Sequence, residues 1–482
     1  MKEFLQIIDN KKGVCFSIVV SIFYVLPLVI ANYNYLDDTG RELYTYGWQH
    51  DGRFIATILG YLWSLGGNIF SLHPYTLILS AFILGVTGYI LSKLLKIEED
   101  YQYKISSLFL ITSPFYLGNL VFKFDCLPMA LSLFVIVFPF IFYHNKRKFY
   151  ALSVLAIFLA LGLYQTSATA YVIIVSIFLI LKFGSQSYKD FFIHTILSAS
   201  SFLLAYILYT IVLNIGAFDL SNKNEMIVTN ENFIKLLQNN VGQFHEDIQV
   251  LFNSGNSSYI YYSLFAISLL GCAFYLRKFS IKNIIPNFLL IAICCNVAFY
   301  LIPSINILLK ESYWAYRSFS GLPFFFLFCA FFISYAPKWG IQLGRVVFGL
   351  MVLFSFILMS QFGRMLTNQT EFNDYFVNEI NRVSIENKIT KISLLGKLPI
   401  AHRNYQTYQV FPIFDKLLSS EISGHDYFAK NYFNQYGLFD FEHKYIDSYD
   451  CSGELIVDHK YYNIIKIEDG YIIVDFNKTD CP

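Results

Sequence analysis

The chain has 482 residues and a formal net charge of +1; 56% of its residues are hydrophobic, 19% are aromatic and only 14% are charged. This composition is typical of integral membrane proteins and excludes an ordinary water-soluble domain. The nearly neutral total charge provides no basic field for nucleic acid and no acidic tail. The distribution of charge along the chain is therefore more informative than its sum.

A helix that crosses the hydrocarbon layer of a membrane needs about 20 mainly apolar residues. By this rule the sequence predicts eleven spans, near residues 13–33, 74–95, 105–122, 126–143, 149–164, 168–183, 191–214, 258–276, 284–304, 321–336 and 346–362. Several are short or are interrupted by Pro or Gly, as at Ser113 and Pro114. The first run is followed by tyrosines and acids, not by a cleavage site, and is predicted to remain as a span.

Lys and Arg residues are distributed unequally between the two sets of loops. With a cytoplasmic N-terminus, sixteen lie at cytoplasmic ends and loops: Lys2, Lys11, Lys12, Lys93, Lys96, Lys104, Lys146, Arg147, Lys148, Lys182, Lys189, Arg277, Lys278, Lys282, Lys338 and Arg345. The opposite loops, apart from the C-terminal segment, hold seven: Arg41, Arg53, Lys123, Lys223, Lys235, Lys310 and Arg317. This asymmetry supports that orientation, because positive loops are retained in the cytoplasm. The first loop (34–73), the segment 215–257 and the C-terminal segment are then extracytoplasmic.

The first loop ends in an apolar stretch, FIATILGYLWSLGGNIF, at residues 54–70. Its apolar residues recur at helical spacing: Ile55, Ile58, Leu59, Leu62 and Leu65. At a rise of about 1.5 Å per residue, this core is too short to cross a hydrocarbon layer of about 30 Å. The pattern predicts a helix lying in the membrane interface, which would hold the acids of the first loop at the level of the lipid headgroups.

The character of the sequence changes at Gly363, after which apolar runs shorten and charged residues mix with aromatic ones. FNDYFVNEINRV has helical spacing, whereas KISLLG, YYNIIKI and YIIVDF alternate like strands. Asp469 and Gly470 separate the last two, a strong hairpin signal. The predicted fold is therefore an all-α polytopic membrane domain over 1–362 with about eleven transmembrane helices, followed by a small extracytoplasmic α/β domain over 363–482.

Cysteine positions divide into two groups. Six lie in or beside apolar spans, where they act most simply as small hydrophobic residues. Cys451 and Cys481 alone lie in the outer domain, and an oxidising periplasm would favour a disulfide between them. No Cys/His spacing resembles a zinc site, and there is no P-loop or dinucleotide fingerprint. We therefore expect no metal site and no soluble cofactor, although the sequence does not decide whether a divalent metal assists.

Charged and polar residues lie at the predicted extracytoplasmic ends of several spans. The first loop carries Asp37, Asp38, Arg41, Glu42, Asp51 and Arg53, and further residues are Lys123 and Asp125 after the third span, Tyr164, Gln165 and Thr166 after the fifth, and Arg317 before the tenth. Each group alone has an ordinary interpretation, as a solvated loop, a snorkelling pair, a satisfied turn or an interfacial belt. All of them, however, are predicted on the same side of the membrane at a similar depth.

Acids and arginines that converge at an outer membrane surface suit one kind of chemistry. A sugar carried on a polyprenyl phosphate presents its anomeric carbon at the headgroup level while its tail stays in the membrane. Transfer to a hydroxyl needs a carboxylate to accept the proton. The departing phosphate needs cations, which arginine supplies through directed hydrogen bonds.

The stretch YLDDTGRELYTYGWQHDGRF with its amphipathic continuation resembles the first outer loop of the serotype-converting O-antigen glucosyltransferases, the Gtr glucosyltransferase II family of GT-C membrane glycosyltransferases. FDCLPMALSLF, LYQTSATAYVII and the closing YYNIIKIEDGYIIVDF are also similar to that family. The resemblance implies a bacterial inner-membrane enzyme that transfers glucose from undecaprenyl phosphate glucose to an O-antigen (lipopolysaccharide) repeat in the periplasm. A donor-synthesising glycosyltransferase and a flippase would be its partners in the pathway, and no nucleic acid would be involved.

The resemblance also implies roles for particular residues. By the family pattern Asp37 is the catalytic base with Asp38 as the second candidate, and Asp125 orients the acceptor or the base. Candidates for binding the donor phosphate are Arg41, Arg53, Arg317 and Lys123, and candidates for binding substrate are Glu42, Tyr164 and Gln165. The outer domain would hold the polysaccharide. The segment 215–257 matches no family motif.

Two alternatives remain open at this point. An O-antigen polymerase also has many spans, but such enzymes concentrate arginine in two long loops, and the segment 215–257 contains none. A flippase or transporter for a lipid-linked sugar predicts charges near the middle of the membrane or two related halves. Here the acids lie at predicted helix ends and no internal repeat is visible. The sequence names neither the acceptor sugar nor its linkage.

Overall fold

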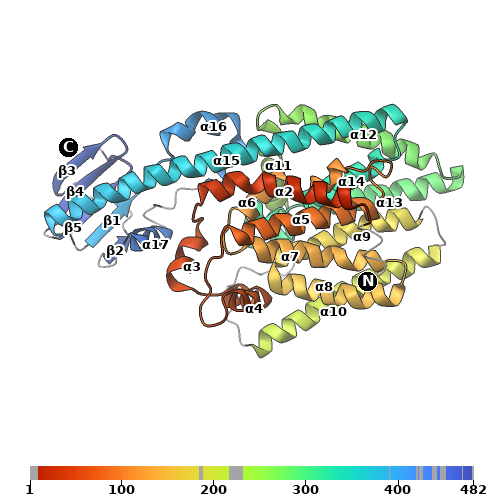
Figure 1. Ribbon diagram of the computed structural model, residues 1–482, viewed down its shortest axis with the longest axis horizontal. Coiled ribbons are helices and arrows are strands. Elements are labelled where there is room, and N and C mark those ends of the chain that lie inside the picture. The colour runs from red at the N-terminus through yellow and green to blue at the C-terminus, as the bar shows by residue number, and fades with distance from the viewer. Residues whose placement is uncertain are drawn as a thin grey trace.

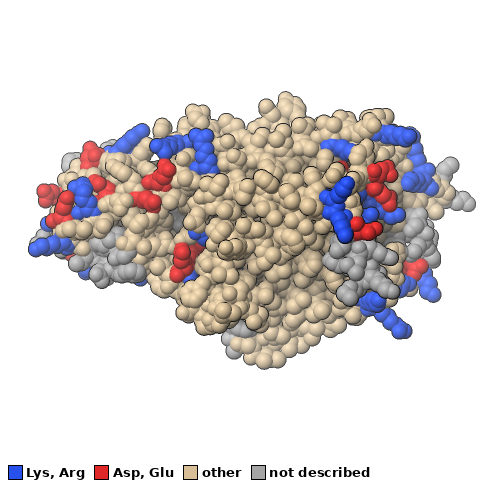
Figure 2. Space-filling view, viewed as in Figure 1, with Lys and Arg blue, Asp and Glu red and all other residues tan. Residues whose placement is uncertain are grey.

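The computed structural model describes residues 9–183, 188–216, 232–389, 391–418, 422, 427–436, 442–445, 452–468 and 470–479. Long helices run along the main axis of the molecule, with the start of α2 near one end and a small sheet at the other (Figure 1). Figure 2 shows Lys, Arg, Asp and Glu gathered toward both ends of the visible face, with an uncharged band between them. Such a band is the surface that a hydrocarbon layer requires.

The helices fall into two length classes. Among the described residues, six helices are long and apolar enough to cross a membrane: α2 (Lys11–Ala31), α5 (Tyr75–Leu94), α10 (Tyr188–Ile215), α12 (Ser257–Leu276), α13 (Ile281–Tyr300) and α15 (Lys338–Asn387). The others along the bundle are shorter: α7 (Cys126–Val137), α8 (Lys146–Leu163), α9 (Ala168–Phe183) and α14 (Leu322–Ile333). A helical membrane protein is confirmed, whereas the number of eleven spans stays a prediction.

The third predicted span is not one helix. Residues 105–122 form three short pieces, η2 (Ile105–Leu108), η3 (Pro114–Tyr116) and α6 (Leu117–Leu120). Pro114 begins η3, and Ser113 before it is extended with ψ 124°, as steric conflict with a following proline requires. Most of this stretch is buried in protein. Burial allows the break, because backbone groups freed from a helix find partners inside the protein and not in lipid.

The C-terminal sheet contains β1 (Lys391–Leu395), β2 (Glu442–Tyr445), β3 (Glu454–His459), β4 (Tyr462–Glu468) and β5 (Tyr471–Asp475) in the order β2-β1-β5-β4-β3. β1 is parallel to β2 and β5, whereas β4 is antiparallel to β3 and β5. The predicted strands are confirmed. Gly470 has φ 78° in the β4–β5 connection; Asp469 lies outside the described residues, as do Cys451 and Cys481 and therefore their predicted disulfide.

Helix α15 joins the bundle to the sheet and runs through the predicted boundary at residue 363. Met365 and Leu366 pack in the core of the bundle, while Phe376 and Ile380 pack against the sheet in a separate core. The change in composition at Gly363 therefore reflects a change of surroundings along one continuous helix. A Cβ at Gly363 would lie 2.7 Å from the backbone oxygen of Pro27, so glycine allows α2 to approach α15 closely at this position.

Candidate active site

The first loop folds into three helical pieces at the end of α2. These are α3 (Asp37–Tyr44), η1 (Gln49–Asp51) and α4 (Phe54–Trp63), and α4 lies across the direction of the long helices (Figure 1). Asp37 and Asp38 occupy the first turn of α3, where a carboxylate faces the positive end of the helix. The short helix predicted after the first loop is present as α4, and its Ile58 and Leu62 are exposed.

The two adjacent acids have different surroundings. Asp38 is fully buried; its Oδ2 accepts hydrogen bonds from the backbone N–H of Lys123 at 2.8 Å and of Tyr35 at 3.3 Å, and its Oδ1 accepts one from Phe124 N–H at 3.3 Å. Burial raises the pKa of Asp38 to about 7, even though these backbone donors favour the charged form. Asp38 therefore ties α3 to the turn before α7 and is not open to a substrate.

Asp37 remains partly accessible, with 29% of its side chain exposed, and its Oδ2 lies 3.6 Å from Nη1 of Arg317. Arg317 is mostly buried between the rings of Phe122 and Tyr313, whose centroids are 4.9 and 5.0 Å from its guanidinium carbon. An arginine held between rings keeps its charge and a fixed direction. Of the two acids, Asp37 is therefore the accessible one; it does not itself line the pocket described below but contacts it through Arg317.

Asp125 is the centre of a buried charge cluster. Its Oδ2 accepts from Arg41 Nη1 at 3.1 Å, and its Oδ1 accepts from Arg53 Nη1 at 2.8 Å and from Trp48 Nε1 at 2.9 Å. Burial alone would raise the pKa of Asp125, but Arg41, Arg53 and Arg317 lower it below its ordinary value. Asp125 therefore stays ionised and holds α3, the Trp48 segment and the start of α4 together.

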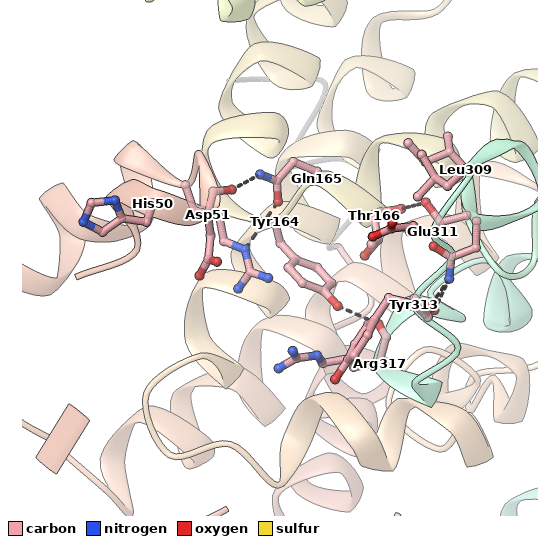
Figure 3. Close-up of a pocket in the computed structure, with 14 residues that line it drawn as sticks. His50, Asp51, Tyr164, Gln165, Thr166, Leu309, Glu311, Tyr313 and Arg317 are labelled. Carbon is pink, nitrogen blue, oxygen red and sulfur yellow. Dashed lines mark hydrogen bonds between the residues drawn. The ribbon is translucent and has the colours of Figure 1, made fainter. Parts of the chain in front are cut away.

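A pocket of about 200 Å³ opens beside this cluster (Figure 3). Its lining comes from the first loop, the turn after α8 and the loop before α14: His50, Asp51, Arg53, Tyr164, Gln165, Thr166, Ser304, Ile305, Asn306, Leu309, Glu311, Tyr313, Arg317 and Ser318. Two guanidinium groups, those of Arg53 and Arg317, belong to this lining. Arginines of this kind can bind an anion, and the carboxylates of Asp51 and Glu311 lie in the same lining.

Tyr164 and Gln165 fix the two arginines relative to each other. The Tyr164 ring centroid lies 4.8 Å from the guanidinium carbon of Arg53, and its hydroxyl donates to the backbone oxygen of Arg317 at 2.7 Å. Arg53 Nε donates to Gln165 Oε1 at 3.3 Å, and Gln165 Nε2 donates to the backbone oxygen of Asp51 at 2.6 Å. Figure 3 shows Tyr164 between Gln165 and Arg317. Residues far apart in the sequence thus converge on one pocket.

A GtrII family model matches residues 26–334; its description is "Glucosyl transferase GtrII". The chain belongs to this family. A relative from Salmonella phage P22, described as an uncharacterized 55.3 kDa protein in the gtrB 5′ region, is 24% identical over 478 residues, which cover 95% of this chain and 97% of the relative. No solved structure gave a significant match. The resemblance seen in the sequence is confirmed, and the whole pocket lining lies in the part that matches the GtrII family.

Three residues predicted to bind substrate or phosphate lie apart from the pocket of this GtrII protein. Lys123 Nζ donates to Asn34 Oδ1 at 2.6 Å, and Asn34 in turn bonds Glu42. Neither Lys123 nor Glu42 lines the pocket. Arg41 does not line it either, because its guanidinium is buried against Asp125 and over the Trp48 ring, 4.6 Å from the centroid.

Several lining residues between the ninth and tenth predicted spans were not predicted from the sequence, above all Asn306 and Glu311. Asn306 Nδ2 donates to the backbone oxygen of Tyr313 at 2.7 Å and to Ser318 Oγ at 2.7 Å, which shapes this loop. Glu311 adds an exposed carboxylate to the lining. The only signal in the sequence was a polar loop between two apolar runs. That signal does not reveal that the loop lies beside the first loop, and this position is what makes these residues part of the site.

Proposed function

We propose that this GtrII protein transfers a glucosyl group from undecaprenyl phosphate glucose to an O-antigen repeat unit of lipopolysaccharide. One observation carries the proposal: a pocket with two arginines adjoins an apolar groove at the start of α4. Arg53 lines the pocket, and the next residue, Phe54, lines the groove. A phosphate carrying a hydrocarbon tail is the ligand that needs both surfaces side by side.

The groove has a volume of about 350 Å³ and is lined by α4 and the end of α10, through Gln49, Phe54, Thr57, Ile58, Tyr61, Val212, Ile215 and Gly216. Ile58 is 54% exposed, and apolar surface of this kind favours contact with a hydrocarbon tail over contact with water by roughly 25 cal/mol for each Å² covered. A nucleotide sugar would use the arginines and leave this groove uncovered. The groove therefore favours a lipid-linked donor.

The proposed reaction is a single displacement. The acceptor hydroxyl oxygen attacks the anomeric carbon of glucose, its proton passes to the Asp37 carboxylate, and the bond from the anomeric carbon to the phosphate oxygen breaks. The lipid phosphate leaves with the electron pair, and Arg317 and Arg53 stabilise its charge. The ion pair between Asp37 and Arg317 keeps base and phosphate site adjacent. Asp125 acts by positioning Arg53, and Asp38 by fixing the turn before α7.

Other lining groups suit the sugar. Asp51 is 52% exposed, and Glu311 is also exposed. Carboxylates and amides at a pocket rim accept hydrogen bonds from sugar hydroxyls, so we assign Asp51, Glu311 and Gln165 to this contact. The charge distribution in the sequence supports a cytoplasmic N-terminus and a periplasmic pocket in the bacterial inner membrane. With two arginines at the phosphate, the proposed reaction needs no metal or soluble cofactor.

The test is reconstitution of the purified protein in liposomes with radiolabelled undecaprenyl phosphate glucose and O-antigen polysaccharide. We expect label in the polysaccharide, release of undecaprenyl phosphate, and the same rate with or without a metal chelator. Asp458→Asn, at an exposed ion pair in the C-terminal sheet, serves as an active control variant. Transfer from a soluble nucleotide sugar in place of the lipid donor, or translocation of the lipid without transfer, would overturn the proposal.

A further inference from the structure

Helix α11 (Phe233–Asn253) lies in the segment 215–257, which matches no family motif. Its buried face carries Phe244, Ile248 and Leu251, as expected for an amphipathic helix. The same face also buries two polar side chains, Asn240 and Asp247, and Asp247 is only 1% exposed. Burying polar groups is unfavourable unless they are bonded, so their partners indicate what the helix is for.

Asn240 bonds a wall of the pocket. Its Nδ2 donates to three backbone oxygens, those of Asn306 at 3.4 Å, Ile307 at 3.1 Å and Leu309 at 2.9 Å. Asn306 and Leu309 line the pocket. One amide from α11 thus fixes the curve of the loop that faces Arg53 and Arg317.

Asp247 acts on the other end of the same loop. Its Oδ1 forms an ion pair with Lys416, and the Lys416 ammonium lies 5.8 Å from the ring centroid of Tyr316. Tyr316 immediately precedes Arg317, and its ring stacks on Phe115 with centroids 4.4 Å apart. The Lys416 ammonium therefore lies over the ring of the residue that immediately precedes the pocket arginine.

Lys416 belongs to a C-terminal segment that is fixed to both α11 and the first loop. Ile413 N–H donates to Ser254 Oγ at 3.1 Å at the end of α11, and Tyr35 hydroxyl donates to the backbone oxygen of Leu417 at 2.7 Å. This segment lies beyond residue 334, where the family match ends. The pocket is thus supported from outside the part that defines the family.

Stability alone does not explain this ion pair, in which the Asp247 side chain is 1% exposed and the Lys416 side chain is 32% exposed. Apolar residues of similar size are often as stabilising as a buried pair, because desolvation offsets the attraction. Moreover, Asp247 Oδ2 and the Tyr316 hydroxyl are buried and have no hydrogen-bond partner among the described residues. A charge kept under these conditions is better explained by its effect on the neighbouring loop.

We propose that Asn240 and the Asp247–Lys416 pair are positioning residues of the donor pocket: Asn240 holds the wall at 306–309, and the pair holds Arg317 through Tyr316. The inference rests on the proposed function. It predicts that the pair affects both donor binding and the rate of transfer, because Arg317 faces the phosphate before transfer and stabilises the charge that the departing phosphate gains.

The test measures kcat and KM for undecaprenyl phosphate glucose in liposomes with Asp247→Asn, Lys416→Gln and the double variant. Each single variant should raise KM and lower kcat, so that kcat/KM falls by about tenfold or more. The double variant should lose no more than a single one, because the pair acts as a unit. Tyr316→Phe keeps the aromatic ring and should have the KM of the wild type. Tyr316→Leu removes the ring and should raise KM. Asn240→Leu tests the wall independently if the charge variants fold poorly.

Glu379→Gln is the matched control, since it breaks an exposed ion pair with Arg382 on α15, away from the pocket. Its KM should equal that of the wild type. Binding of undecaprenyl phosphate is measured on the same preparations by native mass spectrometry. If the wild type binds and transfers but Asp247→Asn, Lys416→Gln and Asn240→Leu lower only the melting temperature and not KM, this inference alone is overturned. If the wild type neither binds undecaprenyl phosphate nor transfers glucose, the proposed function falls and the inference with it.

Discussion

Asp125→Asn removes one charge from a carboxylate that holds Arg41 at 3.1 Å and Arg53 at 2.8 Å. The Asn side chain still accepts a hydrogen bond from Trp48, but both guanidinium groups lose their closest counter-charge. Arg41 is 3% exposed, and its next carboxylate, Asp51, is 3.8 Å away. Removing one partner of a buried ion pair costs about 3–5 kcal/mol. That is a large share of the roughly 5–15 kcal/mol by which folded proteins are stable.

Asp51→Asn is the matched comparison, because it removes a carboxylate from the same arginine where the acid is 52% exposed. An exposed pair contributes at most about 1 kcal/mol. The assay is thermal unfolding in detergent followed by tryptophan fluorescence. We expect a much lower melting temperature for Asp125→Asn and a value near wild type for Asp51→Asn. Equal melting temperatures for the two variants would refute the assignment of Asp125 as the centre of the cluster.

Three further outcomes are expected. Ile58→Glu should raise KM for undecaprenyl phosphate glucose because it puts a charge into the apolar groove, whereas Leu65→Glu, at an exposed position outside the groove, should not; equal KM values would contradict the groove assignment. Burial raises the pKa of Asp38 to about 7 in the folded protein. The stability that the protonated Asp38 contributes is therefore complete below the unfolded pKa of about 4 and is lost as pH rises through about 7. Asp38→Asn is neutral at every pH, so between about pH 5 and about pH 8 its melting temperature should fall less than that of the wild type. Glu371→Cys on α15 should react with a membrane-impermeant thiol reagent added from the periplasmic side of spheroplasts, and labelling only after membrane disruption would reverse the proposed orientation.

Apolar periodicity was enough to predict the helical membrane domain, the short helix α4 and the strands of the C-terminal sheet. It did not predict how the helices break. Residues 105–122 are long and apolar enough for one span, but Pro114 and burial inside protein produce three short pieces. Nor did it predict that α15 continues past Gly363, because a helix that passes from one core to another changes composition without ending.

The candidate site was predicted in part for a related reason. Asp37 and Asp38 are neighbours in sequence, and nothing in their local pattern separates an accessible base from a buried anchor. The backbone N–H groups of Lys123 and Phe124 make that distinction, and they arrive from another loop. Arg41 looked like a phosphate ligand because its charge is visible in the sequence, whereas its burial against Asp125 is not.

The most direct test of the central claim is the single-turnover rate of glucose transfer by Asp37→Asn, with undecaprenyl phosphate binding measured on the same preparation. Asparagine keeps the size of the side chain but cannot accept the proton. We predict that transfer falls by about 10²-fold or more while binding stays near the wild-type level. A rate close to wild type in folded, lipid-binding protein would show that Asp37 is not the base and would contradict the mechanism.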